Sequence, residues 1–179
     1  MNRSFYALLV SQTSTNLGFA LYTMVVVMHL YNETDSTTLS TAVTFISINS
    51  RMVSGIVLSS VSDRFKLPAL LMFSQLAQLV FLSGLFILFF FHELSLAIVI
   101  LIFIFLFCIS FFNGFFLPIK SSIVRAIVPE NTRVKANSLL SSVDQTFLFA
   151  GWTLGGVLLT FLGKEITLLI TFVLILISV

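Results

Sequence analysis

Long apolar runs recur along the whole chain and decide which solvent it can fold in. Residues 94–107, for example, offer almost no polar side chain. The outer face of a soluble helix needs a polar residue at every third or fourth position, and these runs lack them. Of the 179 residues, 58% are hydrophobic and 9% are charged, whereas a soluble domain carries roughly 25% charged residues. The sequence therefore predicts helices surrounded by lipid.

The lengths of these runs predict an all-α membrane protein with about six transmembrane helices. A helix needs about twenty residues to cross a hydrocarbon layer of roughly 30 Å. Runs of this kind occupy residues 5–31, 40–62, 68–91, 94–118, 139–162 and 166–179. The last run is short, so we expect a truncated sixth helix. Membrane-spanning strands would alternate polar and apolar residues, and these runs do not.

Basic residues predict the orientation of the chain, because lysine and arginine favour cytoplasmic loops. If the spans alternate, the basic residues outside the spans fall mostly on one side, namely Arg3, Arg64, Lys66, Lys120, Arg125, Arg133 and Lys135. Lys164 alone falls on the other side. We therefore expect a multi-pass protein of the plasma membrane with a cytoplasmic amino terminus. After Pro118, isoleucines recur every four residues and predict a short amphipathic helix at the lipid headgroups, ending by Pro129.

Several functional classes are excluded by composition and motifs. The net charge of +2 is too small, and the basic residues too dispersed, for a nucleic-acid partner. The single Cys108 provides no disulfide framework. No phosphate-binding glycine loop, metal-ligand spacing or nucleophile with a base is recognisable, so we expect no enzyme activity, cofactor or metal.

The first predicted span is polar well inside its apolar length. Residues 11–16 are all polar, and Gln12, Asn16 and Thr23 share one helix face. Such a face should look toward other helices or a wet cavity. Two interpretations remain open: these side chains line a substrate cavity, or they form hydrogen bonds between helices without binding a ligand.

Arg51 is the most informative residue, because it lies roughly 17 Å inside the second span. Placing an arginine at this depth costs about 2.5–3.5 kcal/mol, so it should face protein or water. It is a candidate contact for an anionic substrate group or for ion coupling. The alternative is an ion pair that only fixes helix packing.

Asp144 and Asn113 are polar residues of later spans. Asp144 lies about five residues inside the fifth span and is a candidate proton carrier, or else an interfacial carboxylate held by hydrogen bonds. Its depth differs from that of Arg51 by roughly 10 Å, which argues against a direct pair. Asn113 interrupts an aromatic run in the fourth span and is a candidate cavity residue.

Several motifs resemble the major facilitator superfamily, in particular its drug-efflux branch with the macrolide efflux proteins. The polar pattern around Gln12 and Gly18 resembles the opening of that branch. The segment with Ser59, Asp63, Arg64 and Lys66 is similar to the signature that controls conformational change in the family. Gly151, Gly155 and Gly156 resemble the helix-packing glycine motif of the fifth span in antiporters.

The resemblance implies that residues 1–179 form the amino-terminal half of a secondary transporter, with the carboxyl-terminal half absent. It implies efflux of a small amphipathic compound such as a drug or macrolide, coupled to an ion. The expected partners are the lipid bilayer, the substrate, a proton, and either a separate carboxyl-terminal half or a second copy. Two alternatives are a substrate-binding subunit of a vitamin-uptake complex and a truncated remnant without transport activity.

Overall fold

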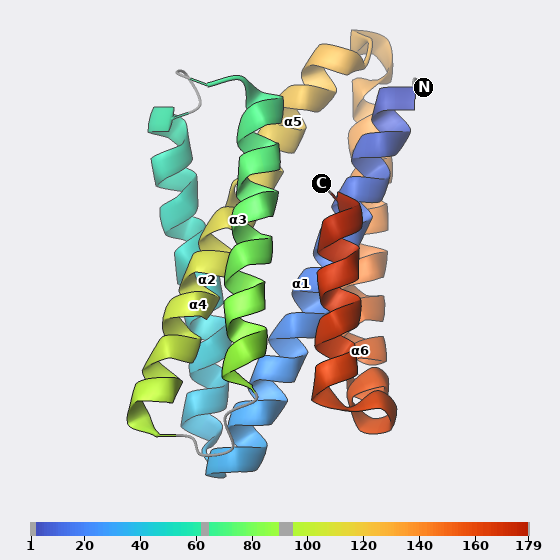
Figure 1. Ribbon diagram of the computed structural model, residues 1–179. Helices are drawn as coiled ribbons and strands as arrows, with labels where there is room; N and C mark the ends of the chain where they lie inside the picture. Colours follow the sequence, from blue (N-terminus) through green and yellow to red (C-terminus); the bar gives the residue numbers. More distant parts are fainter. Residues whose placement is uncertain (1–2, 62–64, 90–94, 179) are drawn as a thin grey trace.

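The computed structural model describes residues 3–61, 65–89 and 95–178, which form helices and short connections without a strand (Figure 1). The helices are α1 (Arg3–Thr34), α2 (Thr37–Val61), α3 (Leu67–Leu88), α4 (Leu96–Gly114), α5 (Phe116–Ile127) and α6 (Arg133–Ser178), with one 3₁₀ turn, η1 (Glu130–Thr132), before α6. For this part of the chain, the prediction of an all-α protein is confirmed.

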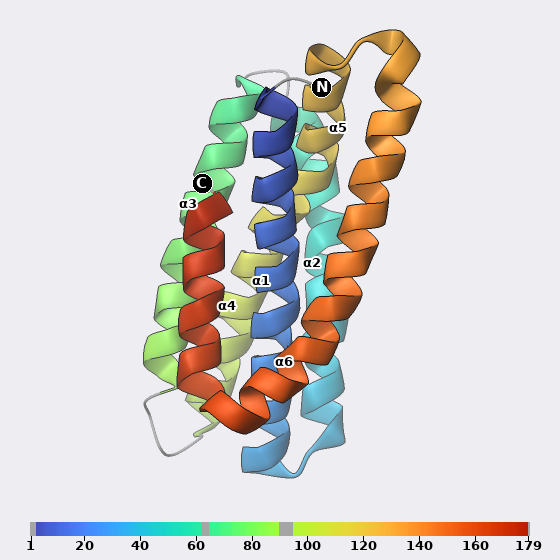
Figure 2. The same cartoon turned by 90° about the vertical axis from the view of Figure 1, so that its right-hand side faces the viewer.

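The helices run up and down beside one another and form a closed circuit. α1 packs along both α6 and α2, α4 joins α2 to α3, and α3 returns to α6. Figure 2 shows that α6 doubles back on itself. α1 lies between α6 on one side and the other helices on the other side. This circuit surrounds an interior that holds both an apolar core and buried polar side chains.

Local sequence explains where the helices begin and end. Pro68 occupies the first turn of α3, where its missing N–H leaves no hydrogen bond unmade. The Ser95 hydroxyl caps α4 by accepting from the Ile98 amide at 3.4 Å. α5 ends at Ile127, and the next residue, Val128, has the extended backbone that is favoured before a proline such as Pro129.

Two helix boundaries differ from the predicted spans. The predicted span 94–118 stops at Gly114, and α5 continues from Phe116 as the expected amphipathic helix. The predicted spans 139–162 and 166–179 belong to one element, α6, which turns at Gly163. Gly163 has φ 80°, a conformation that side chains with a Cβ rarely adopt. We call residues 133–162 the first limb of α6 and residues 164–178 its second limb.

Four helical stretches of the described residues are long and apolar enough to cross a membrane, rather than the six expected. They are Thr37–Leu58, Leu67–Leu88, Leu96–Ile127 and Glu130–Ser178. α1 falls outside this group because its polar run lowers its hydropathy. The last stretch counts once although α6 reverses direction within it.

Several polar side chains are buried and many large apolar side chains are exposed, which is unusual for a soluble protein. Gln12, Gln75 and Gln78 are each 1% exposed, whereas Val80 is 68% and Phe161 81% exposed. A lipid environment favours this arrangement, because apolar side chains gain nothing by avoiding hydrocarbon and polar ones need partners inside the bundle. Buried leucines, isoleucines and aromatic residues of α1, α3 and α4 still form a continuous apolar core.

Candidate functional site

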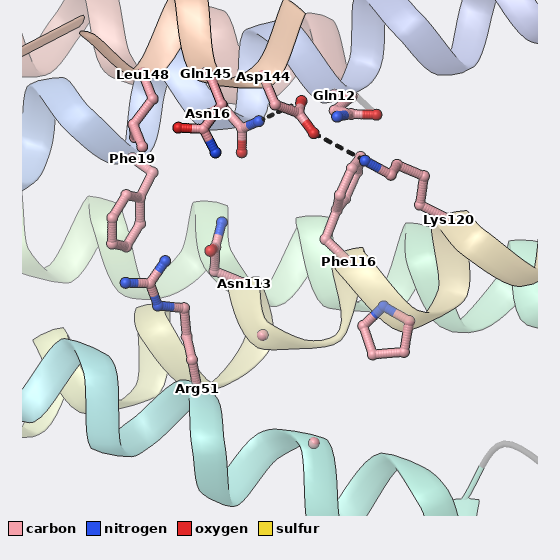
Figure 3. Close-up of a pocket in the computed structure, with 13 residues that line it drawn as sticks. Gln12, Asn16, Phe19, Arg51, Asn113, Phe116, Lys120, Asp144, Gln145 and Leu148 are labelled. Atoms are coloured by element: carbon pink, nitrogen blue, oxygen red, sulfur yellow. Dashed lines mark hydrogen bonds and ion pairs between the residues drawn. The ribbon is translucent and has the colours of Figure 1, made fainter. Parts of the chain in front are cut away.

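A cavity of about 380 Å³ opens among α1, α2, α4, α5 and the first limb of α6 (Figure 3). Its lining consists of Gln12, Asn16, Phe19, Arg51, Gly55, Asn113, Gly114, Phe116, Pro118, Lys120, Asp144, Gln145 and Leu148. The structure thus brings together five residues that the sequence identified on four separate spans: Gln12, Asn16, Arg51, Asn113 and Asp144. Amide, cationic and anionic side chains thus face one space inside an apolar bundle.

Asp144 joins three helices through a short hydrogen-bonded network. Its Oδ2 accepts from Lys120 Nζ at 2.8 Å, and its Oδ1 accepts from Asn16 Nδ2 at 2.7 Å. The Lys120 and Asp144 side chains are 7% and 16% exposed. Charge-assisted bonds of this kind strengthen where water is scarce. The network therefore ties α6 to both α1 and α5 at the cavity wall.

Lys120 was assigned by the sequence to an interfacial helix, and its role in the cavity was missed. The structure buries it to 5% exposure and pairs it with Asp144. A signal was present in the sequence, because Lys120 follows Asn113 by seven residues and thus lies near the same helix face. The break between α4 and α5 preserves this alignment, since both residues line the cavity.

Arg51 reaches the cavity from α2 and does not pair with Asp144, as its depth predicted. Its guanidinium carbon lies 4.4 Å from the centre of the Phe19 ring, a cation–π contact. Its Nε donates a long bond of 3.4 Å to the Ser47 carbonyl. Among the described residues no carboxylate forms an ion pair with Arg51. The alternative of an internal ion pair therefore finds no partner in this part of the chain.

Gln12 is 1% exposed, and neither its side-chain oxygen nor its nitrogen has a hydrogen-bond partner. An unpaired buried amide is costly, and proteins seldom retain one without a role. Thr23, predicted to share the face of Gln12 and Asn16, does not line the cavity. Its hydroxyl is buried and donates to the Phe19 carbonyl of the same helix at 2.7 Å.

A second set of polar residues, of which Gln75 and Ser178 are buried, does not line this cavity. Gln75 of α3 donates to the Ser11 hydroxyl of α1 at 3.0 Å, and Ser11 donates to the Ser178 carbonyl of α6 at 2.7 Å. The side-chain groups that form these bonds find their partners within the bundle. They hold three helices together, so the polar face of α1 serves the cavity on one side and packing on the other.

Comparison with known proteins identifies the family. Residues 8–179, nearly the whole chain, match the Major Facilitator Superfamily. The chain belongs to the Major Facilitator Superfamily. This family is one of membrane transporters and is generally non-enzymatic, and the apolar helices agree with a membrane-embedded protein.

Two curated relatives come from Bacillus subtilis (strain 168). The chain is 47% identical over 173 residues to the uncharacterized MFS-type transporter YfmI, covering 96% of this chain and 42% of YfmI. It is 31% identical over 157 residues to the uncharacterized MFS-type transporter YjbB, covering 88% of this chain and 38% of YjbB. The chain thus spans about two fifths of the length of these relatives. No solved structure gives a significant match.

The residues assigned to the family's conformational signature fall at the junction of α2 and α3. Asp63 and Arg64 lie outside the described residues. Ser59 belongs to α2, and Lys66 is the exposed residue that precedes α3, where its side chain makes no capping bond. The role of this motif stays a prediction.

The three glycines that resemble the antiporter motif face α1 from the first limb of α6. A Cβ added at Gly151 would lie 2.6 Å from Ala20 Cβ, so only glycine permits the observed approach of the two helices. At Gly155 it would lie 3.4 Å from Leu21, and at Gly156 3.5 Å from Met24, which are ordinary contacts or nearly so. Gly151 is therefore the point of closest approach among the three.

Proposed function

We propose that this chain forms part of a secondary active transporter that moves a small amphipathic compound, such as a drug or macrolide, out of the cell. The observation that carries the proposal is the polar cavity inside an apolar bundle. Pure packing would satisfy its polar groups internally, as the Gln75 bonds do, whereas Gln12 and Arg51 retain unused hydrogen-bonding capacity. Membership in the Major Facilitator Superfamily supports transport over the vitamin-uptake and remnant alternatives.

Ion coupling is assigned to Asp144 and its partner Lys120. A proton that binds Asp144 neutralises the carboxylate and weakens its attraction to Lys120. α5 and the first limb of α6 are then free to separate, and loss of the proton restores the pair. This contact would link the protonation state to the width of the cavity.

The proposed topology has six membrane crossings in the plasma membrane, with the amino terminus in the cytoplasm. The two limbs of α6 supply the fifth and sixth crossings, and α4 with α5 supplies the fourth. The end of the bundle that carries the amino terminus also holds the start of α3, the end of α5 and the start of α6 (Figure 1). In the sequence, these described segments contain or adjoin Lys66, Arg125, Arg133 and Lys135. The basic character of this end supports a cytoplasmic position.

A second unit completes the pathway. The relatives are more than twice as long as the matched region, which supports a partner of similar size, either a carboxyl-terminal half or a second copy of this chain. Alternating exposure of the cavity requires two bodies that rock about it.

The test uses an efflux-deficient bacterium that expresses the chain together with the remaining carboxyl-terminal part of YfmI. Accumulation of a fluorescent amphipathic dye is followed before and after the proton gradient is dissipated. We expect energy-dependent efflux that Asp144→Asn abolishes and that the exposed control Glu130→Gln leaves unchanged. Equal accumulation with and without the chain, at verified expression, would contradict the transport proposal, and unchanged efflux by Asp144→Asn would remove ion coupling from this residue.

A further inference from the structure

The charges that line the cavity do not balance. The described lining holds two cations, Arg51 and Lys120, and one anion, Asp144. Both oxygens of Asp144 are engaged, one by Lys120 and the other by Asn16. Arg51 is left with a positive charge that no described carboxylate neutralises.

The Arg51 guanidinium is held in place but remains available to a ligand. The cation–π contact places the guanidinium carbon 4.4 Å from the centre of the Phe19 ring, and the hydrogen bond to the Ser47 carbonyl uses Nε. The terminal nitrogens, which form the fork that binds carboxylate and sulfonate groups in pairs of bonds, make no recorded bond in the described part of the chain. Figure 3 shows this end of Arg51 directed toward Phe19 and Asn113, within the cavity.

Gln12 points to a ligand by a separate observation. It lines the same cavity, it is 1% exposed, and both of its polar side-chain atoms lack partners. A ligand with donor or acceptor groups would satisfy them. Phe19, Phe116 and Leu148 provide apolar surface beside these polar groups, which suits a compound with an apolar body.

From these observations we infer that the cavity binds amphipathic organic anions. The acidic group of the ligand would bind Arg51, and its apolar body would lie against the apolar surface that Phe19, Phe116 and Leu148 provide. The inference rests on the proposed transport function and narrows its substrate class to anions, so that macrolides, which carry a basic amine, fall outside it. It predicts that amphipathic cations bind more weakly. Asp144 is the one carboxylate in the described lining, and a cation that binds it would have to break its ion pair with Lys120. Such a cation would also face the unneutralised charge of Arg51.

A series of three probes with one fluorescent body tests this inference. Dansyl-6-aminohexanoate carries a carboxylate, its primary amide is neutral, and dansylcadaverine carries an amine. Each is titrated against the purified chain in lipid nanodiscs, with empty nanodiscs as the background. We expect the carboxylate to bind about 10- to 100-fold more tightly than the amide, the range for a hydrogen-bonded charge, and the amine to bind most weakly.

Variants assign the preference to Arg51. Arg51→Gln should bring the carboxylate and the amide to equal affinity, and Arg51→Lys should retain part of the preference because the charge remains without the fork. Arg125→Gln is the control, because this exposed arginine of α5 lies outside the cavity and bonds to Ser122. The tightest binding by the amine, or a preference for the carboxylate that survives Arg51→Gln, would overturn the inference.

The same probes in the cellular efflux assay separate this inference from the proposed function. Export of the amine or amide but not the carboxylate would leave transport standing and overturn the anion class. Binding of the carboxylate that depends on Arg51, without export of any probe under conditions of verified expression, would support the site and contradict transport.

Discussion

At the scale of single residues, the cavity combines groups that are costly to bury with groups that offset the cost. The Lys120 ammonium is stabilised by Asp144, and the Asp144 carboxylate also receives the Asn16 amide. Gln12 has no such compensation. This contrast separates residues that stabilise the bundle from residues that reduce its stability, and the two kinds respond differently to substitution.

Replacing Asp144 with asparagine should destabilise the bundle, because Lys120 is then left buried without a countercharge. We expect the free energy of unfolding to fall by about 1–3 kcal/mol. Adding Lys120→Gln to Asp144→Asn should restore most of this loss, since no buried charge remains. Thermal unfolding in detergent measures both effects. A double variant that is less stable than Asp144→Asn would contradict the interpretation of the pair.

Replacing Gln12 with leucine should have the opposite effect on stability. The side chains have similar volumes, and the change removes two unpaired buried polar atoms, so we expect a gain of about 1 kcal/mol in the free energy of unfolding. Gln75→Leu is the matched control: it is equally buried but breaks the bond to Ser11, and should lose about 1–3 kcal/mol. Losses of the same size in both variants would show that Gln12 is satisfied in the native protein.

At the scale of helices, close approach and reversal depend on glycine at two positions. Gly151 lets the first limb of α6 touch α1 at Ala20, and Gly163 lets the chain turn between the limbs with φ 80°. Both features hold α6 against α1, the most extensive helix pair in the bundle. Because Asp144 lies on the first limb, the position of this carboxylate relative to Asn16 depends on the same packing.

Gly151→Ala should push α1 and α6 apart. The added methyl group would lie 2.6 Å from Ala20 and 3.2 Å from Leu17, and overpacking of this kind costs about 1–3 kcal/mol. Gly55→Ala is the control, because a Cβ there meets no atom within 4 Å, and alanine is the better helix former by about 1 kcal/mol. Unfolding temperatures should therefore fall for the first variant and hold or rise for the second. Equal temperatures would contradict the close contact.

Gly163→Ala should destabilise the reversal for a different reason, which is backbone strain. A positive φ costs a residue with a Cβ about 1–3 kcal/mol, whatever space surrounds it. Gly156→Ala serves as the control, because its φ is not positive and its Cβ would meet only the flexible end of Met24 at 3.5 Å. Proteolysis at the turn and the unfolding temperature report the effect. A stable, uncleaved Gly163→Ala variant would argue against the observed turn.

At the scale of the whole molecule, the described charged residues outside the cavity gather at the two ends of the bundle. α1 ends one residue after Glu33 and is followed by Asp35, and this end of the bundle is the one at which α6 reverses at Gly163, next to Lys164 and Glu165 (Figures 1 and 2). The opposite end is predominantly basic. Exposed apolar side chains cover the surface between the two ends. The long axis of the bundle can therefore lie along the membrane normal, with the apolar surface between its ends in the hydrocarbon.

Cysteine labelling tests the direction of this axis. In a Cys108→Ser background, Lys135→Cys should resist a membrane-impermeant maleimide in intact cells and react after permeabilisation, because basic connections remain in the cytoplasm. Glu165→Cys should react in intact cells, since it lies at the other end of the bundle. Labelling of both variants on one side would contradict an odd number of crossings between them.

The sequence was sufficient to predict an all-helical chain and to point to several residues that line the cavity, although the predicted number of spans is not confirmed. Apolar run length gave α2 and α3 to within a few residues, and depth within a span identified Arg51 as a residue that must face protein or water. Thr23 was assigned to the cavity face because it shares the periodicity of Asn16, but the structure turns it to its own backbone. Periodicity defines a helix face and does not decide which part of that face borders a cavity.

By itself, the sequence determined that this chain folds into apolar helices with polar residues directed inward, because hydrocarbon and side-chain polarity act on each segment separately. Only the tertiary structure decided which polar residues meet. The partners of Asp144 lie 24 and 128 residues away along the chain, on helices whose mutual packing no local pattern specifies. The pairing of Lys120, the free charge of Arg51 and the unsatisfied Gln12 all follow from that packing, because hydrogen bonds depend on distances between helices rather than on positions within them.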